Sequence, residues 1–195
     1  MPTSRKVSAR HYGISRFLPR ILRDRSGTGA IEFAMVVPVM LILYMGSFEL
    51  SLGFSMARKV ARASSTIADL TAQRNAVDAA TLDSMKMVVQ RALEPLGGDS
   101  FTMKITGITV ASDGTAKVAW SRDEKGARPY VVGSPVTLPS GLATSTTFVV
   151  RSEVTAPYTL WFYRPNSTET SASITLAKTY YFRQRVGDKI DCQGC

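Results

Sequence analysis

The sequence has one histidine and two cysteines among its 195 residues, and both cysteines lie close to the C-terminal end. Zinc and iron sites need clusters of such ligands, and Ser/His/Asp or Cys/His catalysis needs a histidine oriented by a second group. We therefore expect no metal site, no cofactor and no enzyme activity. Charged residues are also scarce, at 20%, whereas hydrophobic residues reach 45%, which excludes a wholly disordered chain.

The net charge of +9 is concentrated at the N-terminus. Residues 1–27 hold seven basic side chains and one acid, whereas residues 28–195 hold 17 basic and 14 acidic side chains. Basic arms can bind the phosphate backbone of nucleic acids. Here, however, an uncharged run from Phe33 to Phe48 follows the basic arm. This order is typical of a membrane segment with a basic flank, and we expect no nucleic-acid partner.

The apolar run is long enough to cross a membrane. From Ile31 to Phe54 it has 24 residues, about 36 Å as a helix, against a hydrocarbon core of about 30 Å. The leader should stay in the cytoplasm, because seven cations precede the run and only three follow it closely. A cleaved secretory signal is the alternative, but the run is too long for one, and Ala61-Arg62-Ala63 is a poorly placed cleavage site.

Two acids mark the ends of this run. Glu32 begins it and Glu49 follows 17 residues later, about 25 Å along a helix. The two acids should therefore lie near opposite membrane interfaces, one at each end of the span. For Glu49 we favour a plain interfacial carboxylate. Glu32 differs, because a cut after Gly27 would give Thr28 a free amine one helical turn before it. The carboxylate would then offset an amine that opposes the helix dipole, within one helix or between subunits.

The basic leader, Gly27, four residues, Glu32-Phe33 and the apolar helix resemble the processing site of type IV prepilins, especially of the Flp/Tad (tight adherence) branch. The run from Gly29 to Ala34 with Pro38, and then Gly46 to Glu49, resembles TadE-like minor pilins or pseudopilins. The resemblance implies cleavage between Gly27 and Thr28, with Glu32 and Phe33 docking the helix. Gly29 leaves a cut after that residue open.

The resemblance also implies partners and a location. The partners are a prepilin peptidase, other pilins or pseudopilins, the inner-membrane assembly platform of a Tad pilus used in cell adhesion, and the lipid bilayer. The protein would be a single-pass inner-membrane protein with a cytoplasmic N-terminus and a periplasmic C-terminal domain. Two other classes stay open: an unprocessed, membrane-anchored binding or scaffold protein of an envelope or secretion complex, and a periplasmic thiol oxidoreductase.

Hydrophobic periodicity divides the chain into four parts, which are a leader at 1–27, a membrane helix at 28–56, a helical segment at 57–96 and a β domain at 97–195. Pro38 is either a kink in the membrane helix or a tolerated proline. The helix should continue to residue 73, burying Val60, Ala63 and Ile67. A second helix should begin at Thr81 as its N-cap and end before Pro95, with Met85 and Met87 in the core.

From Phe101 the period changes to two, which predicts strands. We expect a hairpin of 101–110 with 116–120 around a turn at 112–115, a long loop at 121–145, and further strands at 146–156, 160–163 and 174–185. The fold class is α+β, with a long N-terminal helix and extracytoplasmic helices packed on a small antiparallel, pilin-like sheet. Core packing is favoured over a partner surface for six aromatic residues: Trp120, Trp161, Phe162, Tyr163, Tyr180 and Tyr181.

The two cysteines form a C-x-x-C sequence, Cys192 to Cys195. In an extracytoplasmic domain a small disulfide loop is the simplest interpretation. Catalytic redox chemistry would require a thiolate stabilised at a helix N-terminus, and the neighbouring Asp191 would instead raise the pKa of a thiol. Free or intermolecular thiols remain an alternative.

Overall fold

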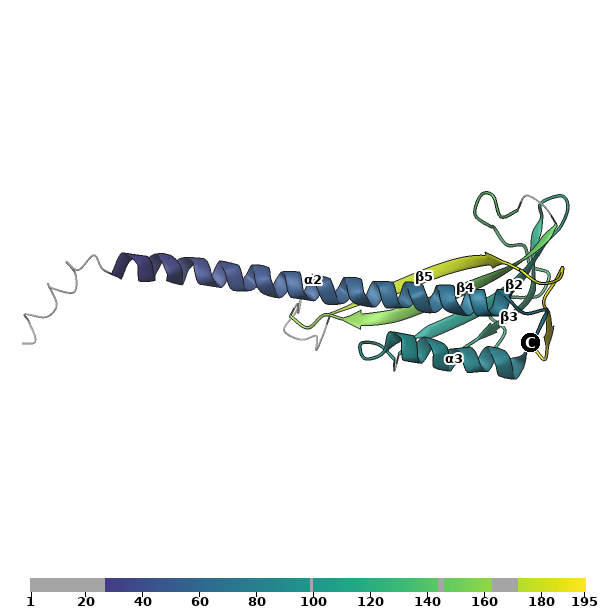
Figure 1. Ribbon diagram of the computed structural model, residues 1–195, viewed down its shortest axis with the longest axis horizontal. Coiled ribbons are helices and arrows are strands. Elements are labelled where there is room, and N and C mark those ends of the chain that lie inside the picture. Colours follow the sequence, from purple (N-terminus) through teal and green to yellow (C-terminus); the bar gives the residue numbers. More distant parts are fainter. Residues whose placement is uncertain (1–26, 99, 144–145, 163–171) are drawn as a thin grey trace, which may run out of the picture. The chain divides into compact units, whose positions relative to one another are not determined.

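The computed structural model describes residues 27–98, 100–143, 146–162 and 172–195. Its elements follow the order helix, short strand, helix, four strands and a last short strand (Figure 1). The chain divides into two units between Met45 and Gly46, and the second unit contains the sheet. The expected α+β class, with a long N-terminal helix followed by a helix and a small antiparallel sheet, is confirmed.

Helix α2 (Thr28–Ala72) continues through Pro38 without interruption. Its first part is exposed, and its second part buries one face, including Val60, Ala63 and Ile67 as predicted. By helical spacing from Ile67, the next position on that face is Leu70 or Thr71. Thr71 is fully buried and donates a hydrogen bond to its own helix at Ile67, whereas Leu70 is partly exposed.

The four-stranded antiparallel sheet has the order β3-β2-β4-β5. Strands β2 (Thr102–Val110) and β3 (Ala116–Asp123) form the predicted hairpin, whose turn needs the positive φ of Gly114. Strands β4 (Thr147–Thr159) and β5 (Ser173–Arg183) pair from Val149 to Thr159 on β4, which covers the whole of β5. The prediction of a separate strand at 160–163 is wrong for residues 160–162, which follow β4 outside any strand, and Tyr163 lies outside the described residues.

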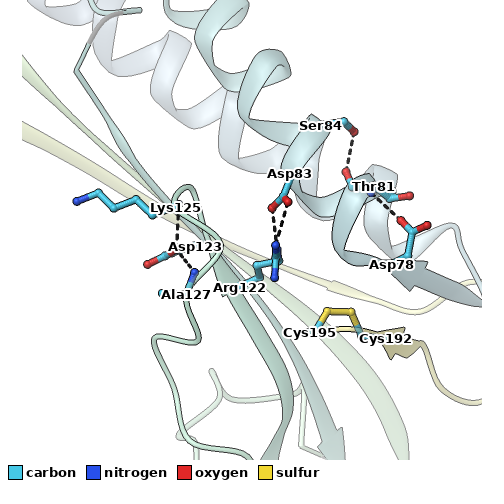
Figure 2. A network of polar contacts seen from close by, with 10 residues as sticks. All are labelled: Asp78, Thr81, Asp83, Ser84, Arg122, Asp123, Lys125, Ala127, Cys192 and Cys195. Carbon is cyan, nitrogen blue, oxygen red and sulfur yellow. Dashed lines mark hydrogen bonds and ion pairs between the residues drawn. A yellow bond between two sulfur atoms is a disulfide. The ribbon is translucent and has the colours of Figure 1, made fainter.

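Helix α3 (Ala79–Leu93) starts three residues earlier than expected. The prediction of Thr81 as N-cap is wrong, because Asp78 caps the helix and accepts a 2.7 Å hydrogen bond from the backbone N–H of Thr81 (Figure 2). Met85 is buried as expected, but Met87 is 67% exposed. Met87 lies two positions from Met85, and residues two apart face different sides of a helix.

The main core lies where α3 and the second part of α2 pack on the same face of the sheet. Met56 and Ile67 from α2 and Leu82 from α3 share one buried cluster with strand residues such as Met103 and Val154. A buried Ser64 on α2 donates a 3.0 Å hydrogen bond to the carbonyl of Ser152 on β4. Burying apolar area provides the main driving force here, and the serine bond satisfies the polar groups that burial removes from water.

Two further contacts stabilise the folded unit, one between α3 and the sheet and one between two short strands. Arg122 on β3 donates 2.7 and 2.9 Å hydrogen bonds to the two carboxylate oxygens of Asp83 on α3 (Figure 2). Strands β1 (Ala76–Asp78) and β6 (Asp191–Gln193) form a parallel pair that the sequence did not predict. Both strands have only three residues, which is too short for a periodic signal.

Candidate functional site

The start of α2 contains the residues that the sequence singled out. The helix begins at Thr28, directly after Gly27, and Glu32 lies in its second turn. Glu32 and Phe33 are both exposed, so their side chains are accessible from outside the subunit. A Cβ atom added at Gly27 or Gly29 would meet no other atom within 4 Å, so packing in the described chain does not require glycine at either position.

The helix between these residues and Phe54 presents apolar side chains on all sides. None of its most apolar 18-residue window is buried, and by length and composition this helix could be a single membrane span. Large exposed side chains there include Met35, Leu43 and Tyr44. An exposed apolar surface of this size is unfavourable in water and favourable in lipid.

Glu49 is the centre of a hydrogen-bonding network in the second unit. The hydroxyl of Tyr158, near the end of β4, donates a 2.8 Å hydrogen bond to Glu49 Oε1. The backbone N–H groups of Trp161 and Phe162 each donate a 3.0 Å hydrogen bond to Oε2. One carboxylate therefore accepts hydrogen bonds from three donors, and these hold the chain segment after β4 against α2.

Close packing of neighbouring residues accompanies the hydrogen bonds around Glu49. Gly53 lies one turn after Glu49, and a Cβ atom at Gly53 would be 3.6 Å from the ring of Tyr158. Phe48 contacts Phe162 edge to face, with ring centroids 6.3 Å apart. Burial, together with the hydrogen bond to Glu49, raises the pKa of Tyr158 to about 12. Tyr158 is therefore a neutral donor throughout the physiological pH range.

Sequence reasoning missed this role of Glu49. It placed the carboxylate near a membrane interface but identified no partner, because Tyr158 and Trp161 are more than 100 residues away in the chain. A sequence signal did exist, since a charged residue in an otherwise apolar helix usually has a polar partner. That signal does not name the partner, which depends on how β4 packs on the helix.

The six aromatic residues are divided by the structure. Trp120 is buried, and its Nε1–H donates a 2.8 Å hydrogen bond to the carbonyl of Ile190. The prediction of core packing is wrong for Trp161 and Phe162, which are 64% and 49% exposed, and for Tyr180 at 36%. Residues 161 and 162 leave the sheet to reach Glu49, so their side chains do not enter the core. Tyr181 is half-buried and packs on a small cluster around Val149 on the opposite face of the sheet.

Cys192 and Cys195 form a disulfide (Figure 2). Cys192 lies on β6 opposite Val77 of β1, not at the N-terminus of a helix. The arrangement therefore lacks the helix dipole that stabilises the thiolate of thioredoxin-type sites. In the described ranges no group of three or more His, Cys, Asp and Glu side chains is arranged to hold a metal ion.

Comparison with protein families agrees with the position of these features. Residues 27–69 match the family model described as TadE-like protein, so the resemblance drawn from the sequence is confirmed over this segment. The matched segment begins at Gly27 and contains Glu32, Pro38 and Glu49. No curated protein and no solved structure matches the chain.

Proposed function

We propose that this chain, with its TadE-like segment at residues 27–69, is a minor pilin or pseudopilin that serves the assembly of a Tad (Flp) pilus. The observation that carries the proposal is the coincidence of three boundaries. The family match begins at Gly27, helix α2 begins at Thr28, and the basic leader ends at the same point. Removal of residues 1–27 by a prepilin peptidase would leave α2 complete.

The processed N-terminus has a chemical role in this proposal. Cleavage gives Thr28 a positively charged amine at the positive end of the helix dipole, which is unfavourable. The carboxylate of Glu32, one turn away, offsets that charge in the same helix or in a neighbouring subunit. Exposed Phe33 then packs against an adjacent apolar helix of another pilin or of the assembly platform.

The protein has no enzymatic step of its own in this proposal. Its helix anchors it in the inner membrane, the basic leader lies in the cytoplasm, and the sheet-containing unit lies on the periplasmic side, with its first residues still inside the membrane helix. A disulfide between Cys192 and Cys195 fits that oxidising compartment. The folded unit then presents its sheet and loops to periplasmic partners while the helix enters the fibre or the platform.

N-terminal sequencing of the full chain from membranes of its host, with and without prepilin peptidase, tests the proposal. We expect a start at Thr28 that depends on the peptidase. Gly27→Ala should reduce cleavage strongly, whereas the matched variant Gly29→Ala should leave it unchanged. A start at Ala30 would show that the peptidase cuts after Gly29. An intact leader in both strains would contradict processing and would favour an unprocessed, membrane-anchored scaffold protein.

The role of Glu32 has a separate test. Glu32→Gln should leave cleavage largely intact but reduce incorporation into pili or assembly intermediates, measured by co-purification with the major pilin. Glu94→Gln is the matched control, because Glu94 is an exposed carboxylate on the folded unit whose side chain forms a surface ion pair with Arg91. Equal incorporation of both variants would contradict the pairing of Glu32 with the amine.

A further inference from the structure

Two adjoining hollows along α2, beside the edge strand β5, form a groove. Its first part has a volume of about 370 Å³ and an almost wholly apolar lining that includes Gly46, Leu50, Ile174 and Leu176. Its second part, of about 420 Å³, is lined by Ala61, Arg58, Lys178 and Tyr180. Phe54 and Ala57 line both parts, so the two parts adjoin, and the stretch of helix from Gly46 to Ala61 that lines them is about 22 Å long on the helical rise.

The polarity of this groove changes along its length. The part nearer Gly46 contains one charged group, Glu49, whose carboxylate already accepts hydrogen bonds from three donors. The other part carries two exposed cations, Arg58 from the helix and Lys178 from β5. In the part of the chain that the structure describes, no ion pair joins either cation to an acid. The groove therefore offers apolar contact at one end and positive charge at the other.

The position of the groove on α2 relates it to the membrane. A hydrocarbon core of about 30 Å takes about 20 helical residues, so a span that starts at Glu32 ends near Leu52. The apolar part of the groove then lies at the level of the lipid chains, and Arg58, about 9 Å further along, lies at the headgroups. Exposed Phe48, Trp161 and Phe162 lie close to this boundary, where aromatic residues are enriched in membrane proteins.

We propose that the groove binds one anionic phospholipid of the leaflet next to the folded unit. Its acyl chain lies against Leu50 and Ile174, and its phosphate is held by Arg58 and Lys178. The helix of a second copy fits less well, because its exposed run from Phe33 to Phe48 carries no charge and would place apolar side chains against both cations. The inference depends on membrane insertion of α2 and not on processing of the leader.

Photolabelling of the full chain in nanodiscs tests the proposal. The bilayer contains phosphatidylcholine and phosphatidylglycerol in a 4:1 ratio, with a trace of either lipid carrying a diazirine in its acyl chain. We expect the phosphatidylglycerol probe to label peptides that contain Leu50, Phe54 and Ile174, with a preference of about tenfold over the phosphatidylcholine probe. Bulk lipid will label the exposed run of α2 with either probe, so the preference is the informative quantity. Equal labelling of the groove residues by the two probes, or the same preference for phosphatidylglycerol outside the groove, would overturn the proposal.

Matched variants separate the two ends of the site. The double variant Arg58→Glu/Lys178→Glu should lose the preference for phosphatidylglycerol. The control double variant Lys86→Glu/Arg128→Glu has the same net charge, but its two positions lie outside the groove, so it should keep that preference. Gly46→Leu should reduce labelling by both probes, because a side chain there enters the groove without a clash. Circular dichroism confirms that each variant is folded.

Two outcomes would assign the groove differently. Crosslinks between two copies at Leu50 or Phe54 would show that the groove is a contact between subunits. If Arg58→Glu/Lys178→Glu keeps the headgroup preference, these two residues do not bind the phosphate. An unprocessed leader in the host, by contrast, would contradict the pilin role and leave these labelling results unaffected.

Discussion

The hydrogen bond between Tyr158 and Glu49 gives the sharpest test of how β4 is held against helix α2. Tyr158 is 3% exposed and donates to a carboxylate at 2.8 Å. Hydrogen bonds to charged groups contribute about 1.5–3 kcal/mol. In Tyr158→Phe the carboxylate keeps its two backbone donors, so we expect the lower end of that range, a loss of about 1.5 kcal/mol in the free energy of unfolding.

Glu49→Gln should cost more, about 2–3 kcal/mol, because an amide NH₂ would face a backbone N–H that needs an acceptor. Tyr158→Phe removes this hydrogen bond and Glu49→Gln replaces its charged acceptor by a neutral amide oxygen, so the double variant should be more stable than the sum predicts by about 1 kcal/mol. The measurement is denaturant unfolding of the full chain in mild detergent micelles, followed by near-UV circular dichroism. Losses that add within about 0.3 kcal/mol would refute the direct bond.

Tyr130 provides a control, because its hydroxyl donates a 2.8 Å hydrogen bond to Glu153 on a different part of the sheet. Tyr130→Phe should also lower stability. Only the Glu49 and Tyr158 variants, however, should speed amide hydrogen exchange at Trp161 and Phe162, whose N–H groups bind Glu49. Faster exchange of these two amides in Tyr130→Phe would show a general loosening instead of a local one.

The raised pKa of Tyr158 adds a dependence on alkaline pH. The protonated phenol is favoured in the folded state, so its contribution is fully present below the ordinary value of 10.0 and is lost as the pH rises towards about 12. A difference of about 2 pH units corresponds to about 3 kcal/mol, which includes the cost of burying a phenolate. Tyr158→Phe should therefore flatten the fall in stability between pH 10 and 12.

Substitutions at three further positions test the fold. Gly107→Ala should cost about 2–3 kcal/mol in thermal unfolding, because its Cβ would lie 2.4 Å from the ring of Trp120 and 2.7 Å from that of Phe148, and an unchanged Tm would contradict this packing. Asp78→Ala should cost about 1 kcal/mol through loss of the α3 N-cap, while Asp78→Asn should cost little. The hydrogen bonds and charge of Arg122 lower the pKa of Asp83, so stability falls as the pH drops below its ordinary 3.8. Asp83→Asn should weaken that acid dependence, and an identical pH profile would argue against the ion pair.

The sequence was sufficient wherever a long periodic or apolar signal exists. The buried faces of α2 and α3 follow helical spacing, and Leu82, Met85, Val89 and Leu93 are all buried. The hairpin of β2 and β3 follows alternation and a glycine turn. The sequence was insufficient for short or non-local features. Examples are the pairing of β1 with β6, the Asp78 cap and the continuation of β4 to Thr159.

The same division applies to the functional features. The basic leader, Gly27, Glu32 and the apolar helix are neighbours in the chain, so their spacing and resemblance were enough to identify the TadE-like segment. Glu49 was visible only as a charge in an apolar run. Its three donors, and the groove that ends between Arg58 and Lys178, join residues more than 100 positions apart. Only the packing of β4 and β5 against α2 decided these contacts, because local sequence patterns carry no information about which distant strand a helix face will meet.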